Sequence, residues 1–333
     1  MDIGIKAIEY TLPEKVLTNE ELAQIYDSWT PEKILTKTGI AARHVVSEGE
    51  CASDLAETAA IKLFESGVIS PKDIDFILLA TQSPDYQLPT TACILQDRLG
   101  IPQTAGAFDF NLGCSAYIYG LAIAKGLVSI GVAQNVLLLT AETYTKHIHR
   151  LDKSTRTIFG EAAAATLIGH NGHAIGDFDL GTDGSGKNAL IIPSGGARLP
   201  RSEATAKEYE DNGSIRSQDN LFMDGAEVFN FSIRVVPQSV KNVLEKHNLA
   251  LADIDLFVFH QANKFMLDYL RKKINIPREK FYVNMQDIGN TVSATIPIAL
   301  KRAEEEGRLH KGDKILLSGF GVGFSWGSTI ITY

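Results

Sequence analysis

The sequence predicts an α/β fold in which strands and helices alternate. Short, nearly continuous apolar runs are typical of strands buried on both faces, and they lie at 73–80, 135–140, 254–259 and 314–318. Helical periodicity fills the stretches between them, at 54–66, 90–99, 115–129, 225–247, 264–273 and 292–305. This alternation indicates sheets covered by helices. A stretch rich in Gly, Ser and charge, 194–220, predicts a long surface loop.

The two halves of the chain repeat the same landmarks in the same order, although two generic strand-helix-strand units could also produce this pattern. A strand, a helix, a turn signal, a second strand and a glycine before a polar residue follow one another in each half. The paired motifs are KDIDFILLA (72–80) with DIDLFVFH (253–260), LGIP (99–102) with INIP (274–277), and Gly113-Cys114 with Gly289-Asn290. A duplication of this kind predicts two related domains, which we assign to residues 1–175 and 176–333.

Composition narrows the class of protein. The chain has 333 residues, of which 44% are hydrophobic and 22% are charged, as in a globular protein. Its net charge of −8 argues against a nucleic-acid partner. No apolar run approaches the roughly 18 residues of a membrane span. Asp2 stands where a signal peptide would carry positive charge, and Pro13 ends a first strand, so we expect a cytoplasmic protein without a membrane partner.

Cys114 is the candidate nucleophile among three cysteines. It follows Gly113 and precedes an apolar helix, whose N-terminal dipole would favour the reactive thiolate. The alternative is a buried structural cysteine, which is the usual fate of a free thiol. Cys93 falls within a predicted helix and is expected in the core, whereas Cys51 falls in a polar loop and is expected to be incidental.

His260 and Asn290 complete a candidate site. His260 ends a buried strand, and Asn290 holds the position in the second half that Cys114 holds in the first. Loops after the carboxyl ends of strands carry the sites of open α/β sheets, so the three side chains should face a common centre. Taken alone, Asn290 could simply cap a helix. We see no group of residues with the spacing of a metal site and expect none.

Several motifs together resemble β-ketoacyl-acyl-carrier-protein synthase III of the thiolase superfamily. These motifs are TKTGIAARH (36–44), LPTTACILQDRLGI (88–101), NLGCSAYIYGL (111–121), MDGAEVF (223–229), HQAN (260–263), GNTVSATIPIAL (289–300) and GFGVGFSWGS (319–328). The resemblance implies a duplicated thiolase-like fold layered αβαβα, usually in a homodimer. It also implies the decarboxylative Claisen condensation of an acyl-CoA-derived group with malonyl-acyl carrier protein, without a cofactor.

The resemblance also implies a role for each matching residue. Cys114 would attack the acyl-CoA carbonyl, with the backbone N–H groups of Cys114 and Val322 as the oxyanion hole. His260 and Asn290 would hydrogen-bond the malonyl thioester oxygen. The residues expected to bind substrate are Leu88, Met223, Gly225, Phe229, Gly321 and Gly323. The residues expected to contact CoA or the carrier are Lys33, Lys37, Arg156, Lys264, Arg271, Lys272 and Lys273.

Some positions depart from the family pattern. Lys33 stands where the family often has the tryptophan that stacks on adenine, and Lys37 replaces an arginine. Phe265 and Asn230 replace an arginine and a lysine that dock the carrier. These changes leave two alternatives open: an acyltransferase of specialised metabolism with another acceptor, and a non-catalytic acyl-binding partner subunit. A cysteine hydrolase has no support beyond Cys and His, and the acyl chain length and branching stay open.

Overall fold

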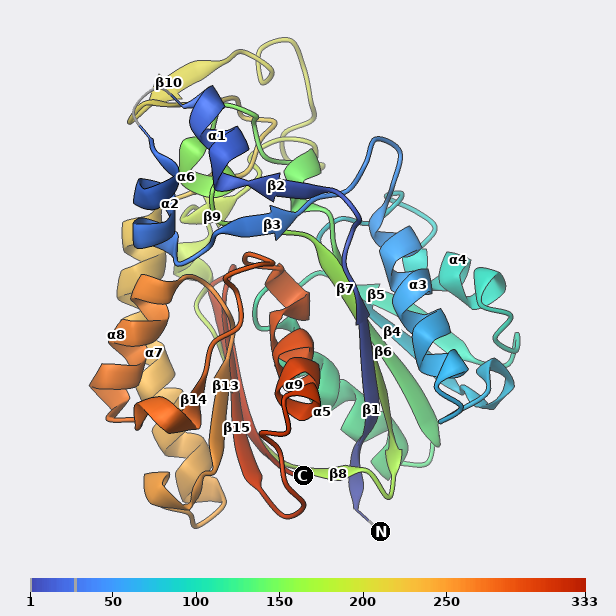
Figure 1. Ribbon diagram of the computed structural model, residues 1–333. Coiled ribbons are helices and arrows are strands. Elements are labelled where there is room, and N and C mark those ends of the chain that lie inside the picture. Colours follow the sequence, from blue (N-terminus) through green and yellow to red (C-terminus); the bar gives the residue numbers. More distant parts are fainter. Residues whose placement is uncertain (1, 27–28) are drawn as a thin grey trace.

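A large mixed sheet organises the molecule (Figure 1). The computed structural model describes residues 2–26 and 29–333. The sheet has ten strands in the order β14-β13-β15-β16-β8-β1-β7-β6-β4-β5. Strands of the first half are β1 (Ile3–Thr11), β4 (Phe76–Ala80), β5 (Gly106–Phe110), β6 (Asn135–Glu142) and β7 (Ala162–His170). Those of the second half are β8 (His173–Thr182), β13 (Leu256–Phe259), β14 (Phe281–Tyr282), β15 (Lys314–Gly321) and β16 (Ser325–Thr332).

The sheet has matching halves on either side of the β1–β8 junction. β1 and β8 are joined through only two residue pairs, Gly4 with Ala174 and Ile5 with His173. Outward from this junction, each half has antiparallel pairings followed by parallel ones. This order supports the duplication predicted from sequence. Because residue 175 lies within β8, we propose that the two domains meet at the turn 171–172.

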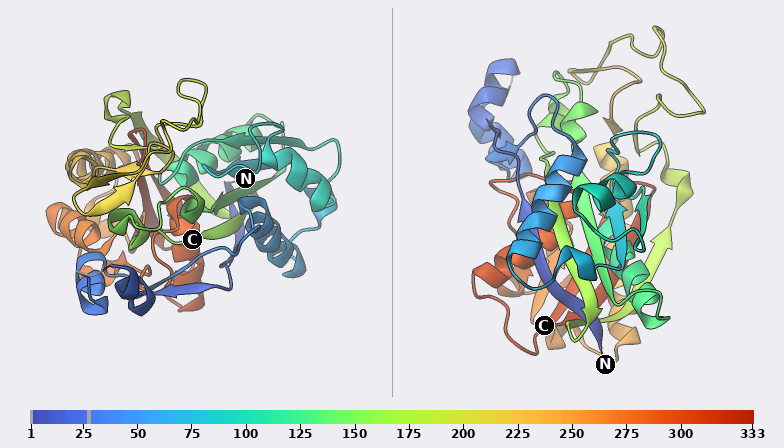
Figure 2. Two further views of the ribbon diagram at one scale, coloured as in Figure 1. Left: turned by 90° about the horizontal axis from the view of Figure 1, so that it is seen from above. Right: turned by 90° about the vertical axis from the view of Figure 1, so that its right-hand side faces the viewer.

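Helices lie between the halves of the sheet, and others cover its outer faces (Figures 1 and 2). α5 (Ala116–Ser129) contacts β6 and β7 of the first half and β15 of the second, while α9 (Thr295–Glu305) contacts β1 and β13. The outer helices are α3 (Ala52–Glu65), α4 (Thr91–Arg98), α7 (Gly225–Lys246) and α8 (Lys264–Ile274). The predicted αβαβα layering is therefore confirmed, and α5 is apolar on most faces because both sides of it are covered.

Smaller elements gather at the end of the molecule opposite both termini (Figure 1). They are β2 (Val16–Thr18), α1 (Asn19–Ile25), α2 (Pro31–Thr38), β3 (Ala42–His44), α6 (Lys153–Arg156), β9 (Leu190–Ile191), β10 (Tyr209–Asp211), β11 (Ser214–Arg216) and β12 (Phe222–Met223). The predicted loop 194–220 lies here and contains the β10–β11 hairpin. None of the described helices combines the length and apolar character that a bilayer crossing requires.

Candidate active site

Cys114 lies in the short connection between β5 and α5, and its side chain is buried. Close packing explains the glycines around it. A Cβ on Gly113 would lie 2.6 Å from Gln82 Oε1, and a Cβ on Gly321 would lie 2.9 Å from Cys114 Sγ. Only residues without a side chain fit at these two positions. The sulfur therefore rests against the backbone at the end of β15.

The resting state of Cys114 differs from the sequence-based expectation of a thiolate. Burial raises the pKa of the thiol to about 12, and the nearby Glu142 raises it further. Backbone hydrogen bonds from Cys114 itself and from Val322 act in the opposite direction. Desolvation disfavours the charged form more than these donors favour it. Cys114 is consequently a neutral thiol at pH 7, near the backbone N–H groups of Cys114 and Val322.

His260 follows β13 and is fixed by hydrogen bonds at both backbone and ring. Its N–H donates to Ser318 O at 2.8 Å, and its Nδ1 lies 2.8 Å from Thr295 Oγ1. The Thr295 hydroxyl donates its single hydrogen to Val292 O at 3.0 Å, so it accepts from Nδ1–H. Nε2 therefore carries a lone pair. Burial lowers the pKa of His260 to about 3, which makes the ring neutral in the resting enzyme.

Asn290 is held more firmly than a simple helix cap requires. Its Oδ1 accepts from the Val292 N–H at 2.9 Å, and its Nδ2 donates to Ala262 O at 3.3 Å. The Asn290 N–H donates to Ile158 O at 2.9 Å. These bonds fix which end of the amide is the donor. A second amide hydrogen is then free to serve a bound oxygen.

One small cavity of about 60 Å³ brings the three predicted site residues together. Met223, Gly225 and Gly321, which were predicted to bind substrate, also line it. Its full lining is Cys114, Ile158, Phe159, Leu190, Met223, Gly225, Val228, His260, Ala262, Asn263, Met266, Asn290, Phe320 and Gly321. Asn263 of the HQAN motif additionally caps α8, because its side chain accepts from the Met266 N–H.

Three residues predicted to bind substrate lie outside this cavity. Leu88 is 82% exposed on the surface. Phe229 is half-buried between α7 and α8 and packs against Phe265 and Tyr269, with ring centroids 5.4 and 5.1 Å away. Gly323 follows Val322 in the turn between β15 and β16 and does not reach the cavity wall.

The other two cysteines do not line the cavity of about 60 Å³. Cys93 is exposed, contrary to the expectation of a core position. Its short helix α4 shows one side to solvent, which the apolar sequence around Cys93 did not reveal. Cys51 is half-buried and precedes α3.

The basic residues predicted to contact CoA or a carrier lie on neighbouring helices. Lys33 and Lys37 of α2 lie over the Trp29 ring, with each Nζ 5.5 and 5.1 Å from its centroid. α2 packs against α8, which carries Lys264. Lys264 pairs with Asp268, and Arg271 donates to Ile276 O at the end of α8. Lys272 and Lys273 are exposed on α8, and Arg156 ends α6.

Glu142 is a buried residue that sequence reasoning missed. It ends β6, accepts from the Gln82 N–H at 3.0 Å and from Ser293 Oγ at 3.0 Å, and so links the two halves of the chain. Burial raises the pKa of Glu142 to about 8. The available signal was an acidic residue directly after the apolar run VLLLTA. Among the described residues, no three or more His, Cys, Asp or Glu side chains are grouped to hold a metal ion.

The layered fold and a buried thiol beside a small cavity define the class of the protein: it is a thiolase-like acyltransferase of the condensing type. Two family models match the chain. They are 3-oxoacyl-[acyl-carrier-protein (ACP)] synthase III, over residues 108–184, and the C-terminal model of the same enzyme, over residues 244–333. The chain belongs to the 3-oxoacyl-ACP synthase III family.

Individual relatives agree with this assignment. The beta-ketoacyl-ACP synthase III of Caldanaerobacter subterraneus subsp. tengcongensis is 39% identical over 332 residues, which cover 99% of this chain and 97% of the relative. A crystal structure of a 3-oxoacyl-ACP synthase III is 50% identical with a TM-score of 0.98, and the match covers 100% of both chains. The enzyme from Thermus thermophilus is 36% identical with a TM-score of 0.88, covering 99% of each chain.

Proposed function

We propose that this protein condenses an acyl group from acyl-CoA with malonyl-ACP and thereby initiates fatty acid or related acyl-chain synthesis. The observation that carries the proposal is the meeting of Cys114, His260 and Asn290 at one cavity. The backbone N–H groups of Cys114 and Val322, which act to lower the pKa of the thiol, support it further. A nucleophile with two adjacent N–H donors is the arrangement that acyl transfer needs.

In the first half-reaction, Cys114 Sγ attacks the acyl-CoA carbonyl. A carbon–sulfur bond to Cys114 forms, the bond to the CoA sulfur breaks, and the thiol proton leaves with CoA. The N–H groups of Cys114 and Val322 stabilise the oxyanion of the tetrahedral intermediate. Removing one such donor typically slows an enzyme by about 10²–10³. Because the resting thiol is neutral, its proton departs as the new bond forms.

In the second half-reaction, the malonyl group loses CO₂ and its enolate attacks the acyl-Cys114 carbonyl. Asn290 Nδ2 and protonated His260 Nε2 donate to the enolate oxygen. The whole condensation consumes one proton, which His260 takes up and returns to the Cys114 sulfur when the acyl–sulfur bond breaks. Burial disfavours imidazolium in the free enzyme, so protonation accompanies binding of the malonyl group.

The partners proposed for the chain are acyl-CoA and malonyl-ACP, with no cofactor beyond the CoA thioester. Lys33, Lys37 and Arg156 are proposed to contact CoA, and Lys264, Arg271, Lys272 and Lys273 the acidic carrier. Lys264, Lys272 and Lys273 are exposed, whereas Arg271 is half-buried. We place the protein in the cytoplasm, where a free nucleophilic thiol stays reduced.

We propose that the protein forms a homodimer, because one edge of its sheet ends in a partly exposed strand. β5 is the terminal strand of the sheet order, and its Phe108 is 37% exposed. Unpaired strand edges invite pairing with another chain. Leu88 and Tyr86, which are also exposed, lie on the loop that follows the neighbouring strand β4. A role for Leu88 in acyl binding therefore requires that it reach the cavity of a second copy.

The test is release of CO₂ from malonyl-ACP labelled at its free carboxyl group. We expect release that depends on added acyl-CoA, together with formation of a β-ketoacyl-ACP. An acyltransferase with another acceptor would become acylated without releasing CO₂. A non-catalytic acyl-binding subunit would neither become acylated nor release CO₂, so each alternative has its own result.

A further inference from the structure

A second chamber of about 210 Å³ lies beside the Cys114 cavity. Leu190 lines both spaces, and Val322, the proposed oxyanion donor, lines the second. Tyr144, Leu190 and Leu221 of the chamber wall pack in one cluster with Cys114. An acyl group held on the sulfur with its carbonyl oxygen at Val322 is therefore next to this chamber.

The chamber is lined by residues of two kinds. The aliphatic ones include Leu190, Ile191, Ile192 and Leu221. The polar ones are Gln82, Asn111, Tyr144 and His147. Asn111 is exposed and Gln82 is half-buried, whereas Tyr144 and the Nε2 atom of His147 are buried. A buried polar atom against hydrocarbon is unfavourable unless it is hydrogen-bonded, so a purely alkyl occupant would leave His147 Nε2 unpaired.

The polar side is partly organised already. The Tyr144 hydroxyl donates to Gln82 Oε1, and Gln82 Nε2 donates to Asn111 Oδ1 at 2.9 Å. These two hydrogen bonds orient Gln82 and Asn111, and the side-chain oxygen of each residue already accepts one of them. The remaining amide hydrogens of Asn111 and of Gln82 stay available as donors. The network is thus prepared to serve an oxygen atom of a ligand.

His147 supplies an unsatisfied group at the far end. Its Nε2 is buried, and within the described part of the chain it has no hydrogen-bond partner. Burial, followed by Arg201 and Lys146, lowers the pKa of His147, so the ring is neutral at pH 7. A neutral imidazole can donate to a carbonyl oxygen, or accept from a hydroxyl, according to its tautomer.

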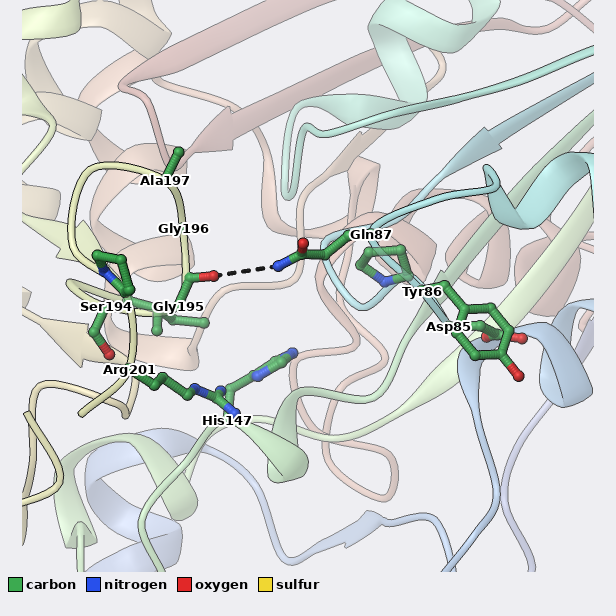
Figure 3. Close-up of a pocket in the computed structure, with 12 residues that line it drawn as sticks. Asp85, Tyr86, Gln87, His147, Ser194, Gly195, Gly196, Ala197 and Arg201 are labelled. Atoms are coloured by element: carbon green, nitrogen blue, oxygen red, sulfur yellow. Dashed lines mark hydrogen bonds between the residues drawn. The ribbon is translucent and has the colours of Figure 1, made fainter. Parts of the chain in front are cut away.

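His147 also forms the boundary with a wider cleft of about 810 Å³. Figure 3 shows the loops of Gln87 and Gly195 facing each other across this cleft, with His147 and Arg201 below them. Gln87 Nε2 donates to Gly195 O at 3.5 Å and so bridges the loops. Since His147 and Ile192 line both spaces, the chamber and the cleft adjoin at these two residues.

The geometry points to a short acyl donor that carries a hydroxyl or carbonyl oxygen beyond its thioester. This inference rests on the proposed function, because it names the acyl group that Cys114 receives. The chamber of about 210 Å³ equals the liquid volume of roughly seven water molecules at about 30 Å³ each, which suits a short acyl group. The aliphatic wall packs the stem of that group, and Asn111, Gln82 and His147 meet its oxygen.

The experiment compares acyl-CoAs of equal length on the full-length enzyme. The pairs are butanoyl-CoA with 3-hydroxybutanoyl-CoA and pentanoyl-CoA with 4-oxopentanoyl-CoA, and the readout is the rate at which intact mass shows the acyl-enzyme. We expect the oxygenated member of at least one pair to react roughly 10- to 100-fold faster, because it satisfies donors that an alkyl chain leaves unpaired. Equal rates, or faster alkyl donors, would overturn the inference.

Variants separate the chamber from general binding. His147→Phe keeps a flat ring but removes Nε2, so the preference for oxygenated donors should shrink to within about threefold. His149→Phe is the matched control, because His149 lies on the same segment and pairs with Glu208 outside the chamber. The control should keep the full preference, and an unchanged preference in His147→Phe would contradict the assignment of His147.

The outcomes also separate this inference from the proposed function. If no donor formed an acyl-enzyme, the result would contradict both the proposed function and the inference. Rapid acylation by butanoyl-CoA or pentanoyl-CoA alone would be consistent with Cys114 as the nucleophile. It would contradict only the inference that the acyl donor carries a further oxygen. The result for each variant is the ratio of its acylation rates with two donors, so partial loss of folded protein does not alter it.

Discussion

The two strand-to-helix junctions that carry Cys114 and Asn290 hold matching places in the sheet but are built differently. Gly113 precedes Cys114 because Gln82 and Val322 leave no room for a Cβ, whereas Gly289 precedes Asn290 with a φ of 74°. Asn290 is fixed through both ends of its amide. Cys114 lies near backbone N–H donors and is otherwise packed among apolar side chains. One junction places a reactive sulfur beside backbone N–H donors, and the other fixes the orientation of a side-chain donor.

The largest effect is expected from removing the fixed donor. Asn290→Ala should retain acylation of Cys114 but lose decarboxylation by about 10²–10³, because the enolate oxygen loses a preorganised hydrogen bond. His260→Ala should behave in the same way. Labelled malonyl-ACP measures CO₂ release, and intact mass measures acylation. Asn188→Ala, on the exposed turn after β8, is the control. Loss of acylation with normal decarboxylation would contradict the roles assigned to the two junctions.

A smaller effect is expected from crowding the sulfur. In Gly321→Ala the new methyl group would lie 2.9 Å from Cys114 Sγ, so the thiol must move and acylation should slow by about 10- to 100-fold. Gly126→Ala is the control, because nothing lies within 4 Å of a Cβ at that position in α5. The acylation rate by intact mass checks both variants. An unaffected rate in Gly321→Ala would mean that the sulfur is not confined as described.

The smallest effect concerns Glu142, which joins the two junctions through Gln82 and Ser293. Burial raises the pKa of Glu142 from 4.5 to about 8. Its contribution to stability is therefore complete below pH 4.5 and is lost as the pH rises through 8. Glu142→Gln stays neutral, and its amide can accept from the Gln82 N–H and donate to Ser293 Oγ. The melting temperature of the variant should fall less between pH 5 and pH 8.5.

The matched melting curves of wild type and Glu142→Gln decide this point. Equal falls of melting temperature over that range would show that Glu142 is already ionised in the folded protein. The same substitution should lower the pH at which Cys114 is alkylated, because ionised Glu142 raises the pKa of the thiol. Alkylation of the peptide that contains Cys114 is measured by mass spectrometry.

The sequence was a good guide to the fold and to the three residues of the site. The apolar runs at 135–140 and 314–318 became β6 and β15 because strands buried on both faces are uniformly apolar. The repeated landmarks predicted that Cys114, His260 and Asn290 would meet, and they line one cavity. Local signals sufficed here because strand ends and glycine turns are encoded by neighbouring residues.

Features that depend on tertiary burial could not be predicted in this way. A helix start favours a thiolate, yet complete burial makes the Cys114 thiol neutral. Leu88 and Phe229 match family motifs, but Leu88 is exposed and Phe229 packs against α8. The polar wall of the second chamber joins Gln82, Asn111 and His147 from three separate loops. These loops follow the adjacent strands β4, β5 and β6, so the edge of the sheet brings them together. The sequence does not show that these particular side chains line one chamber, because that depends on tertiary packing.

The central claim is that Cys114 carries the acyl group. The most direct measurement is peptide mapping by mass spectrometry after exposing the wild-type enzyme and Cys114→Ala to a mixed panel of acyl-CoAs. We predict one acyl adduct, on the peptide that contains Cys114, and none in the variant, while Cys51 and Cys93 stay unmodified in both. An adduct that persists in Cys114→Ala, or that maps to Cys51 or Cys93, would contradict the account.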